Sequence, residues 1–178
     1  MGAPEPDLVA AAVEANTSAL LAYFARRASP EDAADMFGDT LLVAWRRAED
    51  LPADPGEARM WLFGVARRVA ADHRRSRRRR SALQDKLITE LAAGGAAPVD
   101  PVDEQARAAV NRLGDLDREI IRLVYWDGFT LAETARLLER PEGTVRSRHH
   151  RARRQLRAHL ERSEAAGPTH TANVSESH

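Results

Sequence analysis

The sequence predicts an all-α protein with two small helical domains joined by a flexible linker, and three observations favour this fold class. Apolar residues recur every three to four positions over most of the chain, which is the period of an amphipathic helix. Only 5% of the 178 residues are aromatic, fewer than an all-β sandwich normally needs. Residues 91–101 are rich in glycine, proline and small side chains, which is typical of a linker.

Three helices are predicted in the N-terminal half of the chain. The first covers about residues 7–27. Ser29 is the expected N-cap of the second, because Pro30 and two acids follow it in the first helical turn. Two prolines and a glycine predict a loop over residues 51–56, and a third helix should run over about residues 57–80. The apolar stripe expected on the second helix consists of Ala33, Met36, Phe37, Thr40, Leu41, Ala44 and Trp45.

The C-terminal half should contain two helices on either side of Gly114, a turn, a short helix and a long basic helix. Thr130 is the expected cap of the short helix, since Glu133 stands at capping-box spacing from it. Pro141 should begin the last helix, which is expected to end near Arg162. The first two helices are predicted from the spacing of Ala106, Val110, Leu113, Ile120, Ile121, Val124 and Tyr125. The short helix should have a buried face of Leu131, Ala135 and Leu138, and the last helix an apolar stripe of Val145, Ala152, Leu156 and Leu160.

Several classes of protein are excluded by composition. The chain has no cysteine, so it has neither a disulfide scaffold nor a thiol nucleophile. No apolar run is expected to reach the roughly 18–20 residues that span a bilayer, and the acidic N-terminus lacks the features of a signal peptide. The six histidines form no His-Glu-x-x-His pattern, and no glycine loop for phosphate is present. A cytoplasmic protein that is not an enzyme, with no metal or cofactor and no membrane insertion, is therefore expected.

The formal net charge is zero, with 27 basic and 27 acidic side chains, but these charges are unevenly distributed. Residues 59–80 contain nine arginines against one acid, and residues 136–162 contain nine arginines against three acids. Codon bias can favour arginine, but it does not cluster residues. The two basic blocks therefore indicate a nucleic-acid partner, although solvated helix faces remain the alternative for each block taken alone.

The second basic block has the pattern of a helix-turn-helix. A short capped helix, a break at Glu139-Arg140 and a basic helix follow one another between Thr130 and Arg162. The second helix of such a motif places its N-terminal residues at base edges in the major groove. Arginine can form bidentate bonds to guanine there, and other arginines neutralise phosphates. The alternative is a helical hairpin with a solvated basic face.

These motifs resemble two conserved regions of a bacterial sigma factor of the extracytoplasmic-function (ECF) type. Region four is matched by Leu116-Asp117-Arg118-Glu119, Tyr125-Trp126-Asp127-Gly128-Phe129-Thr130-Leu131-Ala132-Glu133 and Pro141-Glu142-Gly143-Thr144-Val145-Arg146-Ser147-Arg148. Region two is matched by Asp35, Asp39-Thr40-Leu41, Ala44-Trp45-Arg46, Trp61-Leu62-Phe63, Ala66-Arg67 and Asp72-His73-Arg74-Arg75. The resemblance covers about residues 8–80 and 104–160. It implies region two at 1–80, a linker at 81–103, region four at 104–162 and a disordered tail at 163–178.

The resemblance implies a factor that binds core RNA polymerase and directs initiation at particular promoters. The partners that it implies are the β′ clamp helices and β flap of the polymerase, promoter DNA and an anti-sigma factor. For polymerase binding it indicates Asp35, Asp39, Leu42, Trp45 and Arg46. For the −10 element and promoter melting it indicates Asp54, Arg59, Trp61, Arg67, Arg68, Arg74 and Arg75. For the −35 element it indicates Thr144, Arg146, Ser147, Arg148, His149 and Arg151.

Some of these assignments have alternatives. Trp61 also lies on an apolar stripe and can be a core residue, and Asp54 can belong to an ordinary surface turn. Gly38, Arg68 and His149 depart from the residues common in the family, which limits transfer at those positions. The rival functions are a helix-turn-helix regulator that binds DNA without polymerase and an interaction protein whose first domain is an anti-sigma or scaffold bundle.

Overall fold

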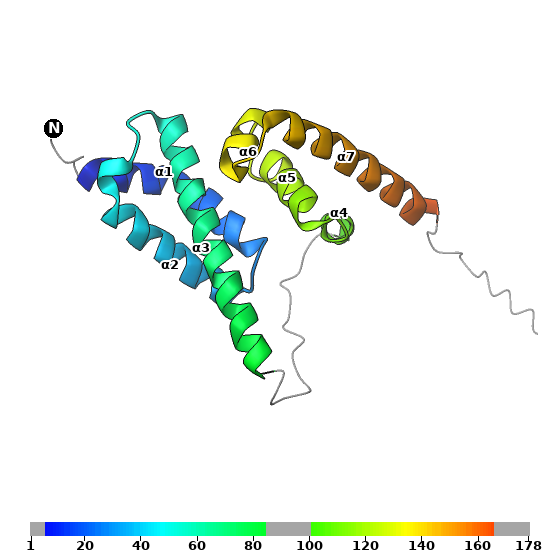
Figure 1. Cartoon of the computed structure of the whole chain (residues 1–178), viewed down its shortest axis with the longest axis horizontal. Helices are drawn as coiled ribbons and strands as arrows, with labels where there is room; N and C mark the ends of the chain where they lie inside the picture. Colours follow the sequence, from blue (N-terminus) through cyan, green and yellow to red (C-terminus); the bar gives the residue numbers. More distant parts are fainter. Residues whose placement is uncertain (1–5, 85–100, 166–178) are drawn as a thin grey trace, which may run out of the picture. The chain divides into compact units, whose positions relative to one another are not determined.

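The structure is a computed structural model that describes residues 6–84 and 101–165 (Figure 1). Those ranges contain seven α-helices and a short 3-10 helix, and no strand occurs within them. They form two compact units, one built from α1 to α3 and the other from α4, α5, α7 and most of α6. The prediction of an all-α chain with two helical domains is confirmed.

The first unit is a bundle of α1 (Pro6–Ala25), α2 (Pro30–Arg46) and α3 (Pro55–Gln84), in which each helix contacts the other two. Ser29 caps α2 as predicted, because its Oγ accepts a hydrogen bond from the backbone N–H of Asp32 at 3.2 Å. The core includes a T-shaped stack of Tyr23 on Phe63, with ring centroids 5.5 Å apart. A second cluster joins all three helices through Val9, Ala44, Leu51, Ala58 and Leu62.

The α1 helix corrects one expectation. Its segment Leu8–Ala25, with a mean hydropathy of 1.4, is long and apolar enough to cross a membrane by length and composition, whereas no such segment was expected. In the bundle, however, its large side chains Val9, Leu20, Tyr23 and Phe24 are buried against protein. An apolar helix buried on one side in this way also satisfies the packing of a helical core.

The start of α3 differs from the predicted loop over residues 51–56. A 3-10 helix, Ala48–Asp50, follows α2, and Pro55 and Gly56 already belong to the first turn of α3. The reason is local, since Asp54 Oδ1 accepts a hydrogen bond from the N–H of Glu57 at 2.9 Å and proline is tolerated at the first helical position.

Both ends of the predicted linker at 81–103 are helical. α3 continues to Gln84, and α4 (Pro101–Asn111) already begins at Pro101. Most of the linker, 85–100, lies outside the described residues, as does most of the predicted tail. α7 extends to Ala165, three residues beyond the predicted end of the second domain.

In the second unit, α4, α5 (Asp115–Tyr125) and α7 (Glu142–Ala165) contact one another. Their shared core contains Val110, Leu113, Ile121 and Ala152. Two residues of the apolar patterns that predict these helices, Tyr125 and Leu160, are exposed. Each lies near the end of its helix, where fewer neighbouring elements are available to cover it.

The helix-turn-helix forms as predicted. Gly128 adopts a φ of +72° in the turn before α6 (Leu131–Leu138), a conformation that glycine adopts without strain. The capping box is complete, because the Thr130 N–H donates to Glu133 Oε2 at 2.7 Å and the Glu133 N–H donates to Thr130 Oγ1 at 3.2 Å. Between α6 and α7, Glu139 has a positive φ of 53°, which ends the first helix and turns the chain into the second.

Candidate functional site

The exposed face of α2 carries an open groove of about 700 Å³. Leu42 and Trp45 line it and are 53% and 47% exposed, although Trp45 was expected on the buried stripe. Asp35 and Asp39 place two carboxylates beside these apolar side chains. Four of the five predicted polymerase-binding residues therefore share one groove. Arg46 is exposed on the same helix but does not line it.

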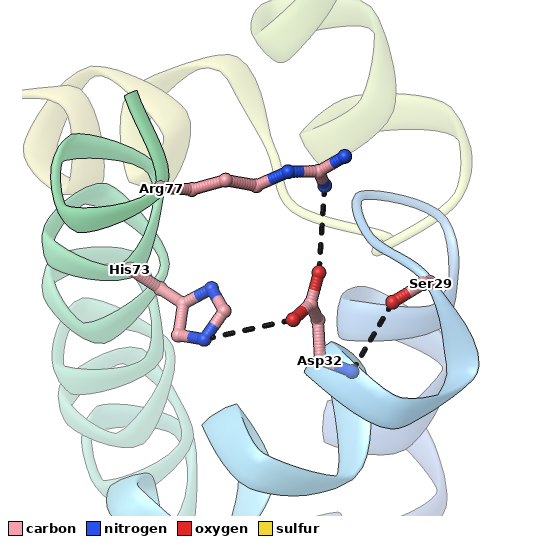
Figure 2. A network of polar contacts seen from close by, with 4 residues as sticks. All are labelled: Ser29, Asp32, His73 and Arg77. Carbon is pink, nitrogen blue, oxygen red and sulfur yellow. Dashed lines mark hydrogen bonds and ion pairs between the residues drawn. The ribbon is translucent and has the colours of Figure 1, made fainter. Parts of the chain in front are cut away.

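The groove also contains His73, which comes from α3. His73 Nε2 lies 3.8 Å from Asp32 Oδ1, and Arg77 Nη1 lies 3.4 Å from Asp32 Oδ2 (Figure 2). Figure 2 shows one oxygen of the Asp32 carboxylate directed at His73 and the other at Arg77, while the backbone N–H of Asp32 donates a hydrogen bond to Ser29. The first turn of α2 is thereby tied to the basic half of α3.

The basic face of α3 extends along the second half of that helix. Arg68, Arg74 and Arg75 are exposed, and Arg67 is half-buried. Arg75 pairs with Asp72 of the same helix. An i, i+3 pair of this kind leaves the positive face facing solvent and adds little stability.

Three other predicted −10 residues lie near the start of α3. Trp61 packs against the core cluster, with the Arg47 guanidinium 5.9 Å from its ring centroid. Arg59 lies over the Phe63 ring at 5.0 Å. Asp54 is the N-cap described above. Trp61 and Arg74 are separated by about 20 Å along the helix axis at 1.5 Å per residue, so the structure spreads this predicted set over α3 rather than gathering it.

The predicted −35 residues divide between two faces of α7. Thr144, Arg146, Ser147 and Arg151 are exposed, while Val145 between them is completely buried. The Ser147 hydroxyl donates to the Thr144 carbonyl at 3.0 Å, and Arg146 pairs with Glu142 in the first turn. Thr144, Ser147 and Arg151 lie on one side of the N-terminal half of the helix, whereas Arg146 lies 100° or more away from them around the helix, beside Glu142.

Arg148 and His149 face α5 instead. Arg148 Nη1 donates to Asp117 Oδ1 at 2.9 Å, and the Asp117 side chain is only 12% exposed. The His149 ring stacks on Tyr125, with centroids 5.7 Å apart and planes 20° apart. Burial lowers the pKa of His149 from its ordinary value, and the charges of Arg153 and His150 lower it further, so the neutral imidazole is favoured.

Sequence reasoning missed the roles of Asp32, Asp117 and Tyr125. Asp32 was predicted only as an acid in the first turn of its helix, Asp117 only as part of the region-four motif, and Tyr125 as part of an apolar pattern and of the same motif. Each aspartate is the third residue of its helix, a position that favours an acid for the helix dipole alone. Only their contacts with the basic helices identify a second role. Among the described residues, no group of three or more histidine or acidic side chains is placed to hold a metal.

Two family models match the chain. The model described as "Sigma-70 region 2" covers residues 13–80, and the model described as "Sigma-70, region 4" covers residues 103–156. The first contains the groove and most of the basic helix α3, and the second contains the helix-turn-helix.

Similar proteins fall in the same group. The ECF RNA polymerase sigma factor SigL of Mycobacterium tuberculosis is 32% identical over 169 residues, covering 89% of this chain and 92% of SigL. SigK of Mycolicibacterium vanbaalenii is 33% identical over 132 residues, covering 67% and 64% of the two chains.

Two solved structures have a similar fold. The sigma factor RpoE of Bartonella quintana, solved in complex with the anti-sigma factor NepR, matches with a TM-score of 0.65 and 28% identity, over 83% of this chain and 95% of RpoE. CnrH, solved in complex with the cytosolic domain of CnrY, matches with a TM-score of 0.61 and 25% identity, over 86% and 87% of the chains.

Proposed function

The chain belongs to the sigma-70 family as an ECF RNA polymerase sigma factor that directs promoter-specific transcription initiation, and from this premise we propose how its two units divide promoter recognition. The α1–α3 unit holds core polymerase and the −10 region, and the α4–α7 unit reads the −35 element. The factor itself catalyses no reaction and works in the cytoplasm together with polymerase.

The polymerase contact is made by the groove on α2. Exposed Leu42 and Trp45 supply an apolar centre, and Asp35 and Asp39 supply negative charge at its side. Large exposed aromatic and aliphatic side chains that line a groove are typical of protein-binding surfaces. The resemblance of this helix to the clamp-binding helix of region two suggests that the β′ clamp helices are the partner. The β flap is the corresponding proposed partner of the second unit.

The unpaired −10 strand is held along α3. Single-stranded DNA binds where a positively charged surface follows the backbone and aromatic side chains offer stacking faces. Arg68, Arg74 and Arg75 are exposed and supply the positive charge. Trp61 is half-buried against the core, so its contribution is mainly to fix the shape of the first half of α3. Asp54, as N-cap, shapes the loop next to it.

The −35 duplex is read by the exposed side of α7. Thr144, Ser147 and Arg151 stand on one face at spacings of three and four residues, and Arg146 is exposed on another side of the same helix. This arginine-bearing face, on the second helix of a capped helix-turn-helix, is the single observation that carries the proposal.

An anti-sigma factor is the proposed inhibitory partner. RpoE of Bartonella quintana was solved with the anti-sigma factor NepR, and it shares the fold of this chain at 28% identity. The exposed apolar groove on α2 offers such a partner a surface that polymerase would also need.

Reconstituted run-off transcription tests the proposal. Core polymerase is incubated with the chain on genomic DNA fragments, and the transcripts are sequenced to find shared −35 and −10 elements upstream of their starts. We expect Trp45→Ala to reduce binding to core polymerase, whereas Arg151→Ala should reduce transcription while core binding is kept. Arg157→Ala, an exposed arginine further along α7, is the matched control. Tight, specific binding of promoter duplex by the chain without core polymerase would instead favour a regulator that acts alone.

A further inference from the structure

The contact between Asp117 and Arg148 joins two helices that are distant in the sequence. The two residues lie 31 positions apart, on the first turn of α5 and the second turn of α7. Their side chains are 12% and 37% exposed, and the donor–acceptor distance is 2.9 Å. A carboxylate this well buried needs a partner, since an uncompensated buried charge is strongly unfavourable. The pair therefore holds the second turn of α7 in a defined position against the first turn of α5.

A second contact lies at the other end of α5. Tyr125, the last residue of α5, stacks on His149, which follows Arg148 directly. Successive residues of an α-helix point about 100° apart. Arg148 and His149 thus hold α7 to opposite ends of α5, and Val145 and Ala152 are buried beside them. We infer that these contacts restrict the rotation of α7 about its own axis.

That rotation decides which side chains face away from α5. Thr144, Ser147 and Arg151 are all exposed and lie within about 60° of one another around the helix. A small rotation of α7 about its axis would change the direction of these three side chains relative to the rest of the unit. Readout of base edges depends on such directions, because each bidentate pair requires defined geometry.

We propose that Asp117 is a positioning residue for −35 recognition, which acts through Arg148 to set the rotation of α7 so that Thr144, Ser147 and Arg151 meet the base edges. Arg148 then belongs to the positioning contact and not to the reading surface. The inference rests on the proposed function of α7 and adds a residue of α5 to it.

The measurement is −35 discrimination by the reconstituted holoenzyme. A promoter found by run-off sequencing is compared with the same promoter carrying a scrambled −35 element, and the ratio of the two transcript yields is recorded for each variant. Thermal unfolding of each variant, followed by circular dichroism, fixes an assay temperature at which all are folded. Asp115→Asn is the matched control, because Asp115 is an exposed acid in the same turn of α5 and pairs with Arg118 at 3.5 Å.

Asp117→Asn should lower the discrimination ratio about tenfold, the effect of 1.4 kcal/mol, while binding to core polymerase and the Asp115→Asn ratio stay unchanged. Arg148→Lys should also lower it, because lysine is the shorter side chain. Adding Asp117→Glu to Arg148→Lys lengthens the acid by one methylene and should restore most of the ratio. A contact that serves only general stability would not be expected to give this rescue once all variants are folded.

Direct reading of DNA by Arg148 would give another result. Asp117→Asn would then leave discrimination intact, Arg148→Lys would reduce it, and Asp117→Glu would not rescue it. That outcome overturns the positioning role. Arg151→Ala separates this failure from failure of the proposed function. If Arg151→Ala also keeps full discrimination, the exposed face of α7 is not the reader, and the assignment of the whole helix is wrong.

Discussion

The two units use the same kind of contact with different degrees of burial. In each, an aspartate at the third position of one helix pairs with an arginine of a longer basic helix: Asp32 with Arg77 in the first unit and Asp117 with Arg148 in the second. The first pair is 3.4 Å long with an arginine that is 69% exposed, whereas the second is 2.9 Å long with an arginine that is 37% exposed.

The difference in burial predicts that Arg77 changes partners more easily than Arg148 does. An exposed ion pair contributes about 0–1 kcal/mol and is screened by salt, so Arg77 can exchange Asp32 for a phosphate at little cost. A buried pair cannot be broken so easily, because the remaining charge is left without water or a partner. Under the proposed function, this difference would suit α3 to a single strand of variable shape and α7 to a duplex that is read in one register.

The largest expected effect tests whether the two cores are separate. Phe63 is almost completely buried and stacks on Tyr23. Phe63→Ala should destabilise the α1–α3 unit by about 3–5 kcal/mol through lost burial and a residual cavity. Urea unfolding followed by hydrogen exchange of individual segments should show this loss in α1–α3 and no change in α4–α7. An equal loss of protection in both units would contradict the division.

The next effect tests the buried pair. Arg148→Met retains an unbranched apolar stem but removes the guanidinium, so Asp117 is left without its partner. We expect the α4–α7 unit to lose about 2–4 kcal/mol, below the largest values for fully buried pairs because Arg148 is partly exposed. Urea unfolding of the whole chain, with protection followed in α5 and α7, measures it. If the loss is below about 1 kcal/mol, the pair has the energetics of a surface contact.

A smaller effect is expected at the exposed pair. Asp32→Asn keeps the backbone N–H that Ser29 accepts from, and it removes only the charge facing His73 and Arg77. The α1–α3 unit should lose about 1 kcal/mol or less, and the loss should shrink at high salt. Unfolding midpoints at low and high ionic strength would check this. Ser29→Ala is a useful comparison, because loss of a cap costs about 1 kcal/mol without a strong salt dependence.

The smallest expected effect is on the pH dependence of the stability of the α4–α7 unit. The pKa of His149 is lowered in the folded chain, so the unfolded chain binds a proton more readily. Stability linked to this group is therefore complete above the ordinary histidine pKa of about 6.5 and declines as the pH falls below it. His149→Phe, which keeps an aromatic ring against Tyr125, should remove that part of the decline. Identical pH profiles for the parent chain and the variant would show that His149 does not contribute.

Much of the fold could be predicted because helix boundaries depend on short-range bonds. The Ser29 cap and the Thr130–Glu133 capping box were both predicted, and each is formed by groups three residues apart. Resemblance in two separate segments also indicated the family, to which the region models and relatives assign the chain. The residue-level assignments to promoter DNA and polymerase stay predictions.

The exposed side chains and the pairing of charges were harder to predict. Trp45 continues an apolar stripe in the sequence, and only the packing of the bundle leaves it exposed in a groove with Leu42. Tyr125 likewise has the spacing of a core residue but stacks on His149 at the surface. Periodicity specifies a direction around one helix, but burial depends on whether another helix covers that direction.

The sequence by itself determined the order of the helices, two of their caps, the two basic blocks and the family, because these follow from local spacing and from motifs. Tertiary structure alone decided which arginines of α7 remain exposed to solvent. Arg148 and Arg151 are three residues apart on one basic helix, yet one is bonded to a buried aspartate of α5 and the other faces solvent. Asp117 and Arg148 become partners only when α5 and α7 pack together, since a contact across 31 residues has no signature in the spacing of either helix.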